Sequence, residues 1–125
     1  MPAILIVGED PDSIKPEDFP PGVTAGTIRA ALNQARATLQ TKGHEAEILL
    51  TTSADRIASE LADAVRGRSF DVIVVGAGLR VLPAMARHFE QLMNAIREHA
   101  PNARLAFNTK PEDTAEAAER QIEGG

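Results

Sequence analysis

Short apolar runs alternate along this chain with longer segments in which apolar residues recur every three or four positions. The apolar runs cover residues 3–7, 46–50, 72–75 and 104–107. Runs of this length that are rich in valine, isoleucine and leucine are typical of buried strands. The pattern therefore predicts four β-strands separated by helices.

Each of the four helical segments carries an apolar stripe that we interpret as facing the core. The stripes are Ile28, Leu32, Ala35 and Leu39; Ile57, Leu61, Ala64 and Val65; Met85, Phe89, Leu92 and Ile96; and Ala115, Ala118 and Ile122. Gly43 follows the first stripe, where a left-handed residue ends a helix, and Pro83 suits the first turn of the third helix. Alternating strands and helices predict a parallel sheet with right-handed crossovers.

The order of the strands follows from their polarity. Residues 4–7 and 72–75 are continuously apolar, as strands covered on both faces should be. Residues 44–48 alternate and residues 103–107 include a charge, so both segments resemble edges. The resulting order, 2-1-3-4, predicts a three-layer, doubly wound, flavodoxin-like (Rossmann-like) α/β fold with four helices. The fourth strand would be an exposed edge, which makes a homodimer through it a reasonable hypothesis.

Composition narrows the class of protein. The chain has 125 residues, 43% of them hydrophobic and 25% charged, so we interpret residues 1–125 as a single globular domain. A net charge of −5 and only four aromatic residues argue against nucleic acid as a partner, and the acidic balance disfavours anionic membranes. Cysteine is absent, which excludes disulfides and thiolate chemistry. Without a basic, apolar leader pattern at its start or a long apolar run, the chain is predicted to be cytoplasmic.

The segment after the first strand is a long, acidic, proline-rich loop at residues 9–22. Most connections of this kind are about 2–6 residues long, so a longer one is functional or disordered. Glu9, Asp10 and Asp12 leave the strand first, and they could hold Mg²⁺ or a hydroxylated ligand. The alternative is that the acidic loop is exposed to solvent and binds no ligand. This interpretation is favoured for Glu17 and Asp18.

The segment after the third strand reads Gly-Ala-Gly-Leu-Arg. Gly76, Ala77 and Gly78 would permit close backbone approach and positive φ before a helix N-terminus that attracts anions. Arg80 is the only charge between Asp71 and Arg87, and it could clamp a phosphate or a carboxylate. The alternative is a plain tight turn, with Arg80 paired to an acid of the first loop.

Three polar residues follow the fourth strand. Asn108 and Lys110 could reach the same rim of the sheet, whereas Thr109 suits the start of a helix. In open parallel sheets ligands bind at the point where the strand order reverses, here between the loops after strands 1 and 3. No histidine cluster, Walker loop or nucleophile elbow is present, so no metal site and no catalytic residue are assigned.

Two resemblances to known families are partial. Acidic residues after the first strand and Lys110 after the fourth resemble a response-regulator receiver. That family places its phosphate-accepting aspartate at the end of the third strand, where this chain has Val75-Gly76. Phosphotransfer is therefore not expected.

The segments GEDPD (8–12), SADR (53–56) and GAGLRVLPAM (76–85) are similar to motifs of the carboxyaminoimidazole ribonucleotide mutases of purine synthesis. This resemblance implies a nucleotide- or phosphosugar-binding rim at Asp10, Gly76 and Gly78. Both histidines of that family are missing, with Asp55 in place of one, so mutase activity is not expected.

Two functional hypotheses follow. In the first, the domain binds a small anionic ligand, bearing phosphate or carboxylate, between the loops after strands 1 and 3, with Mg²⁺ as the one cofactor the carboxylates suggest. In the second, it is a non-catalytic interaction or regulatory module that dimerises. The sequence does not decide whether the chain is an enzyme.

Overall fold

A computed structural model describes residues 2–124 and shows one four-stranded, all-parallel sheet. The strands run in the order β2-β1-β3-β4, which confirms the predicted 2-1-3-4 topology. Their bounds are Ala3–Glu9 (β1), Glu45–Thr51 (β2), Val72–Val75 (β3) and Arg104–Phe107 (β4). In register, Val7 lies beside Val75, and Val75 lies beside Phe107.

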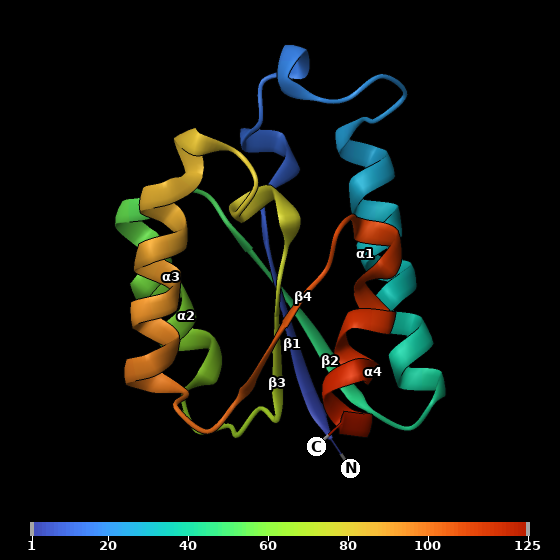
Figure 1. The fold of residues 1–125 in the computed structure, drawn as a ribbon, viewed down its shortest axis with the longest axis vertical. Coiled ribbons are helices and arrows are strands. Elements are labelled where there is room, and N and C mark those ends of the chain that lie inside the picture. Colours follow the sequence, from blue (N-terminus) through green and yellow to red (C-terminus); the bar gives the residue numbers. More distant parts are fainter. Residues whose placement is uncertain (1, 125) are drawn as a thin grey trace.

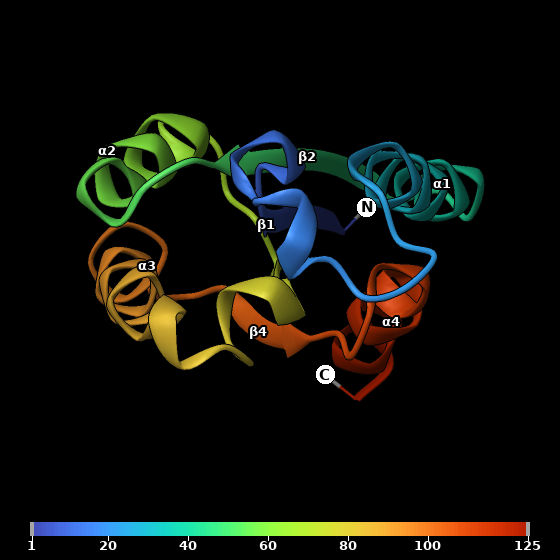
Figure 2. The ribbon, with the colours of Figure 1, turned by 90° about the horizontal axis from the view of Figure 1, so that it is seen from above.

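Four α-helices cover the two faces of the sheet, as predicted for a three-layer flavodoxin-like α/β fold. Their bounds are Ala25–Thr41 (α1), Ala54–Val65 (α2), Ala86–His99 (α3) and Thr114–Gly124 (α4). Helices α2 and α3 pack on one face, and α1 and α4 pack on the other (Figures 1 and 2).

The core divides into two apolar clusters because successive side chains of a strand point to opposite faces. Leu5 and Val7 of β1 join Leu61 of α2 and Leu92 of α3 on one side. On the other side, Ile4 and Ile6 pack with Leu39 of α1 and with Ala117 and Ala118 of α4. Strands β1 and β3 are therefore buried on both faces, as their continuous apolar runs require.

The two edge strands are β2 and β4, as their charged residues predicted. On β2, Glu45 and Glu47 are exposed, and Arg68 forms ion pairs with both. On β4, Arg104 and Phe107 are exposed. Gly43, after α1, has a φ of 92°, which confirms the predicted left-handed residue.

The loops at the carboxyl ends of β1 and β3 contain short 3-10 turns, and the place of Pro83 differs from expectation. The first contains two short 3-10 turns, Pro11–Ser13 and Pro16–Asp18, before α1. After β3, two further turns, Ala77–Leu79 and Pro83–Met85, precede α3. Pro83 therefore opens a 3-10 turn rather than α3, which begins at Ala86.

Candidate functional site

The predicted site lies at the carboxyl ends of the strands, where the 9–22 loop and the segment 76–85 rise above the sheet (Figure 1). Seen from above, the segment 76–85 sits on the β4 side of this rim (Figure 2). The rim is where an open parallel sheet binds ligands. The partners of each predicted residue show how much of the rim is free.

The aspartates of the first loop face α1. Arg29 of α1 forms ion pairs with Asp10 (2.8 Å) and Asp12 (2.6 Å) through the same Nη2 atom. Asp10 also accepts a hydrogen bond from the Asp12 amide (3.0 Å), and its own amide donates to the Thr51 carbonyl (2.8 Å). The two carboxylates therefore hold the loop against α1, and the backbone amide of Asp10 holds it against β2.

No α-helix begins directly after the Gly76–Gly78 segment. Gly76 has a φ of −65°, and among the described residues only Gly22, Gly43 and Gly67 have positive φ, so neither Gly76 nor Gly78 uses the positive φ that it would permit. The three-residue turn that follows is not the start of α3. Close approach is confirmed for Gly76 alone: a Cβ there would lie 3.2 Å from the Val7 carbonyl oxygen, whereas a Cβ on Gly78 would meet nothing within 4 Å.

Asn108 is the centre of a buried hydrogen-bond network. Its side chain accepts a hydrogen bond from the Ala77 amide (2.7 Å) and donates one to the Thr114 hydroxyl (2.9 Å). Asn108 and Thr114 are 3% and 0% exposed. The network ties the loop after β3 to the end of β4 and the start of α4, so Asn108 acts here as a structural connector.

Arg80 joins the same network from above. Its Nη2 donates to the Asn108 carbonyl, and its guanidinium stacks on the Phe107 ring at 5.1 Å from the centroid. Its Nε is buried and has no hydrogen-bond partner among residues 2–124. Arg80 therefore pairs with β4 rather than with an acid of the first loop.

The large hydrophobic side chains that residues 2–124 leave exposed are Phe107, under the Arg80 guanidinium, and the two residues that follow Arg80 in the chain. Val81 is 63% exposed, Leu82 50% and Phe107 38%. We call these three residues, together with Arg80, the apolar corner. Sequence reasoning selected Arg80 but missed its apolar neighbours, although Val81-Leu82 stands outside the helical stripe that follows.

Lys110 and Thr109 belong to the start of α4. The backbone amide and hydroxyl of Thr109 donate to the Asp113 carboxylate, as does the amide of Lys110 (3.4 Å). Partial desolvation raises the pKa of Asp113, but these hydrogen bonds and the Lys110 charge outweigh it and hold the pKa below its usual value. Thr109 is thus a helix-start residue, as expected, and Lys110 is exposed.

Glu9 differs from the other predicted residues because it is half-buried and unpaired. No hydrogen bond or ion pair within residues 2–124 reaches its carboxylate, and its place at the end of β1 puts it on the face covered by α2 and α3. Burial raises the pKa of Glu9 above its usual value of 4.5. A desolvated carboxyl at the strand-order reversal is the feature of this rim most typical of a functional site.

Because the pKa of Glu9 is raised, we predict that Glu9→Gln increases the free energy of unfolding, and that the increase depends on pH. The folded state binds this proton more tightly than the unfolded state, so wild-type stability falls as pH rises from about 4.5 through the raised pKa. The glutamine variant carries no charge to bury. We expect it to be more stable than wild type at pH 7 and equal to it at pH 4, measured by urea unfolding; equal stability at both pH values would contradict the burial of Glu9.

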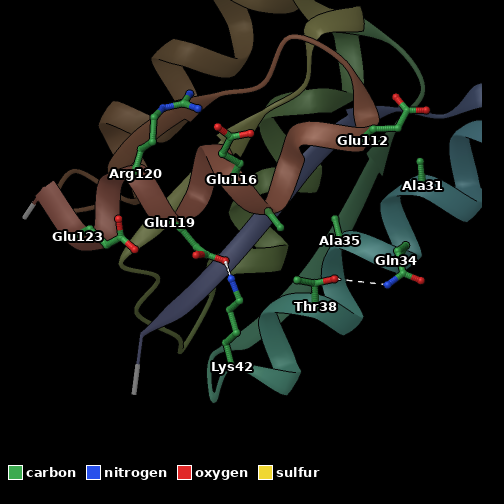
Figure 3. Close-up of a pocket in the computed structure, with 11 residues that line it drawn as sticks. Ala31, Gln34, Ala35, Thr38, Lys42, Glu112, Glu116, Glu119, Arg120 and Glu123 are labelled. Atoms are coloured by element: carbon green, nitrogen blue, oxygen red, sulfur yellow. Dashed lines mark hydrogen bonds and ion pairs between the residues drawn. The ribbon is translucent and has the colours of Figure 1, made fainter.

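Two hollows of the structure lie away from the loops after β1 and β3. The larger, of about 630 Å³, is a groove between α1 and α4 (Figure 3). Ala31 and Ala35 line its α1 side, glutamates of α4 line the other, and Lys42 meets Glu119 across it at 2.6 Å. Small side chains on the two facing helices leave this space unfilled. In the sequence, only the alanines of these two helices indicate such a groove. A smaller hollow of about 280 Å³ lies at the amino ends of β3 and β4.

Within residues 2–124, no group of three or more histidine, aspartate or glutamate side chains is arranged to hold a metal ion. No helix in that range is long and apolar enough to cross a membrane.

Comparison with known proteins supports the fold alone. No protein-family model matches the chain, and no curated protein matches it in sequence. Among solved structures, the chain is similar to a fragment described as a "putative lipoprotein" from Peptoclostridium difficile 630, with a TM-score of 0.56 and 11% sequence identity. The match covers 100% of this chain and 98% of that one, so the whole architecture is shared.

Proposed function

We propose that this chain is a protein-interaction module and that the apolar corner is its contact surface. The observation that carries the proposal is that the large hydrophobic side chains exposed among residues 2–124 are Phe107, on which Arg80 stacks, and the two residues that directly follow Arg80, Val81 and Leu82. Contiguous exposed apolar surface is unusual on soluble proteins and marks interaction sites. Aromatic residues and arginine are the types enriched where protein partners meet.

The partners of the predicted anion-binding residues support this choice over a ligand site. Asp10 and Asp12 both form ion pairs with Arg29, and Arg80 donates a hydrogen bond to the Asn108 carbonyl. A ligand that used these groups would have to replace internal hydrogen bonds. The exposed corner needs no such exchange, because stacking on Phe107 already holds the Arg80 guanidinium in place.

The proposal is tested by selecting peptides from a random library against the folded chain. We expect selected peptides to shift backbone amide resonances of residues 80–82 and 105–108, and to lose at least about tenfold in affinity for the double variant Val81→Ser, Phe107→Ser, since each truncated hot-spot side chain costs about 1 kcal/mol or more. The matched control is Val23→Ser, a half-buried valine of the first loop, which should bind as wild type. Equal binding to the double variant would overturn the proposal.

Glu9 favours a second candidate, a small-ligand site between the loops after β1 and β3. A half-buried carboxylate without a partner could accept a hydrogen bond from a ligand hydroxyl or contribute to a Mg²⁺ site. A thermal-shift panel of nucleotides, sugar phosphates and Mg²⁺ tests it, because a ligand at 100 times its Kd stabilises the fold by about 2.7 kcal/mol. Stabilisation that Glu9→Gln or Arg80→Ala abolishes would support this candidate, and unchanged melting curves would reject it.

A further inference from the structure

We infer that the partner of the apolar corner is a second copy of this chain, paired antiparallel along β4 with Leu105 on a two-fold axis. This inference rests on the proposed function and gives its contact surface an occupant. It is argued from the outward backbone groups of β4, the sizes of its side chains and the contrast with β2.

The outward backbone groups of β4 belong to Leu105 and Phe107. The Arg104 amide donates to the Asp71 carbonyl (2.9 Å) on the β3 side, and in a parallel ladder alternate residues face the same neighbour. Leu105 and Phe107 therefore present their N–H and C=O groups to the open edge. Arg120 of α4 covers one of these groups, donating to the Phe107 carbonyl (3.0 Å).

This arrangement selects one antiparallel register. With Leu105 opposite Leu105 of the second copy, the two residues exchange both backbone hydrogen bonds. Phe107 then lies opposite Ala103, whose own amide already donates to the Ala100 carbonyl (3.1 Å). The Phe107 N–H can therefore donate to the Ala103 carbonyl of the second copy. The hydrogen bond from Arg120 to the Phe107 carbonyl stays intact. With the two-fold axis at Ala106 instead, Leu105 would pair with Phe107, which requires that carbonyl and displaces Arg120.

Side-chain sizes agree with the same register. The sequence from 103 to 107 is Ala-Arg-Leu-Ala-Phe, so pairing about Leu105 sets Arg104 and Phe107 each against an alanine and Leu105 against its own copy. Phe107 faces Ala103 on the α3 side of the sheet, and Arg104 faces Ala106 on the α4 side. Large-against-small pairs fill the space between strands without crowding.

The two edges of the sheet differ in how they are protected. On β2, the exposed Glu45 and Glu47 with their Arg68 bridge charge the strand, which discourages pairing. Strand β4 exposes Phe107, on which Arg80, the residue before Val81 and Leu82, stacks. An edge that ends in exposed apolar side chains is the one that association would bury. A two-fold contact along it brings the apolar corners of both copies into one interface.

Single-cysteine variants test the register, because the chain has no cysteine of its own. Under mild oxidation we expect Leu105→Cys to form a covalent dimer at least about tenfold faster than Ile48→Cys, since paired strands hold the thiols at high effective concentration. Ile48 is the matched control, a half-buried aliphatic residue on the other edge strand. A mixture of Ala103→Cys and Phe107→Cys chains, distinguished by mass, should cross-link to each other faster than either does to itself.

The outcomes separate this inference from the proposed function. Sedimentation velocity should show a dimer that Phe107→Ser weakens. A monomer at all concentrations, or a dimer whose Leu105→Cys variant cross-links no faster than Ile48→Cys, overturns the second copy as partner. Peptides that still bind residues 80–82 and 105–108 would leave the interaction module standing, with another strand or protein as its occupant.

Discussion

Replacing Asn108 by alanine should lower the free energy of unfolding by about 2–4 kcal/mol, because buried polar groups lose their partners at two points. The Ala77 amide loses its acceptor at 2.7 Å, and the Thr114 hydroxyl loses its donor at 2.9 Å. Asn108 is 3% exposed, so water does not easily replace the missing side chain. Urea unfolding monitored by far-UV circular dichroism measures the loss.

A local readout distinguishes this network from a general packing role. The Ala77 amide should lose its protection from hydrogen exchange in Asn108→Ala, because its acceptor is gone. Asn102→Ala is the matched control, an exposed asparagine in the turn before β4, and it should leave both stability and exchange unchanged. If Asn108→Ala unfolds like Asn102→Ala, Asn108 does not connect the loop to α4.

The sheet and its order could be predicted because they depend on patterns within each strand. Continuous apolar residues at 72–75 mark a strand covered on both faces, and Arg104 marks an edge, whatever the rest of the chain does. The helices could be predicted for the same reason. An apolar stripe such as Leu32, Ala35 and Leu39 is visible within its own helix, whichever face of the sheet buries it.

The partners of the rim residues could not be predicted because they lie far apart in sequence. Arg80 reads as a free cation, yet its acceptor is the carbonyl of a residue 28 positions later. Backbone carbonyls are present at every residue, so sequence gives no sign of which one is chosen. Asp10 likewise pairs with Arg29, which lies on the polar side of an apolar stripe. Free charges in a loop are therefore weak indicators of a ligand site.

The two glycines of the Gly-Ala-Gly segment also show what sequence leaves open. They look equivalent in the motif, but only Gly76 lies against the central strand β1, where its amide donates to the Val7 carbonyl (2.8 Å). Gly78 lies in a 3-10 turn with open space around it. Within the motif, Gly76 is therefore closely packed, whereas the fold does not require a glycine at position 78.

This difference predicts opposite results for Gly76→Ala and Gly78→Ala. A Cβ at position 76 would lie 3.2 Å from the Val7 carbonyl oxygen and 3.5 Å from the Gly8 Cα, and both atoms belong to the backbone of a strand held from two sides. Relieving the contact shifts β1 or β3, and we expect a loss of about 1–2 kcal/mol in unfolding free energy. The negative φ of Gly76 suits alanine, so steric contact alone carries the effect.

Gly78→Ala is the matched control, one residue from the first and in the same loop. Nothing lies within 4 Å of its added methyl, so we expect no loss, or a gain of up to about 1 kcal/mol from the less flexible unfolded chain. Thermal or urea unfolding of both variants side by side measures the contrast. Equal stabilities would mean that β1 and the segment after β3 do not approach as closely as 3.2 Å implies. A loss confined to Gly76→Ala would show that the fold needs a glycine at position 76 for packing between the two central strands.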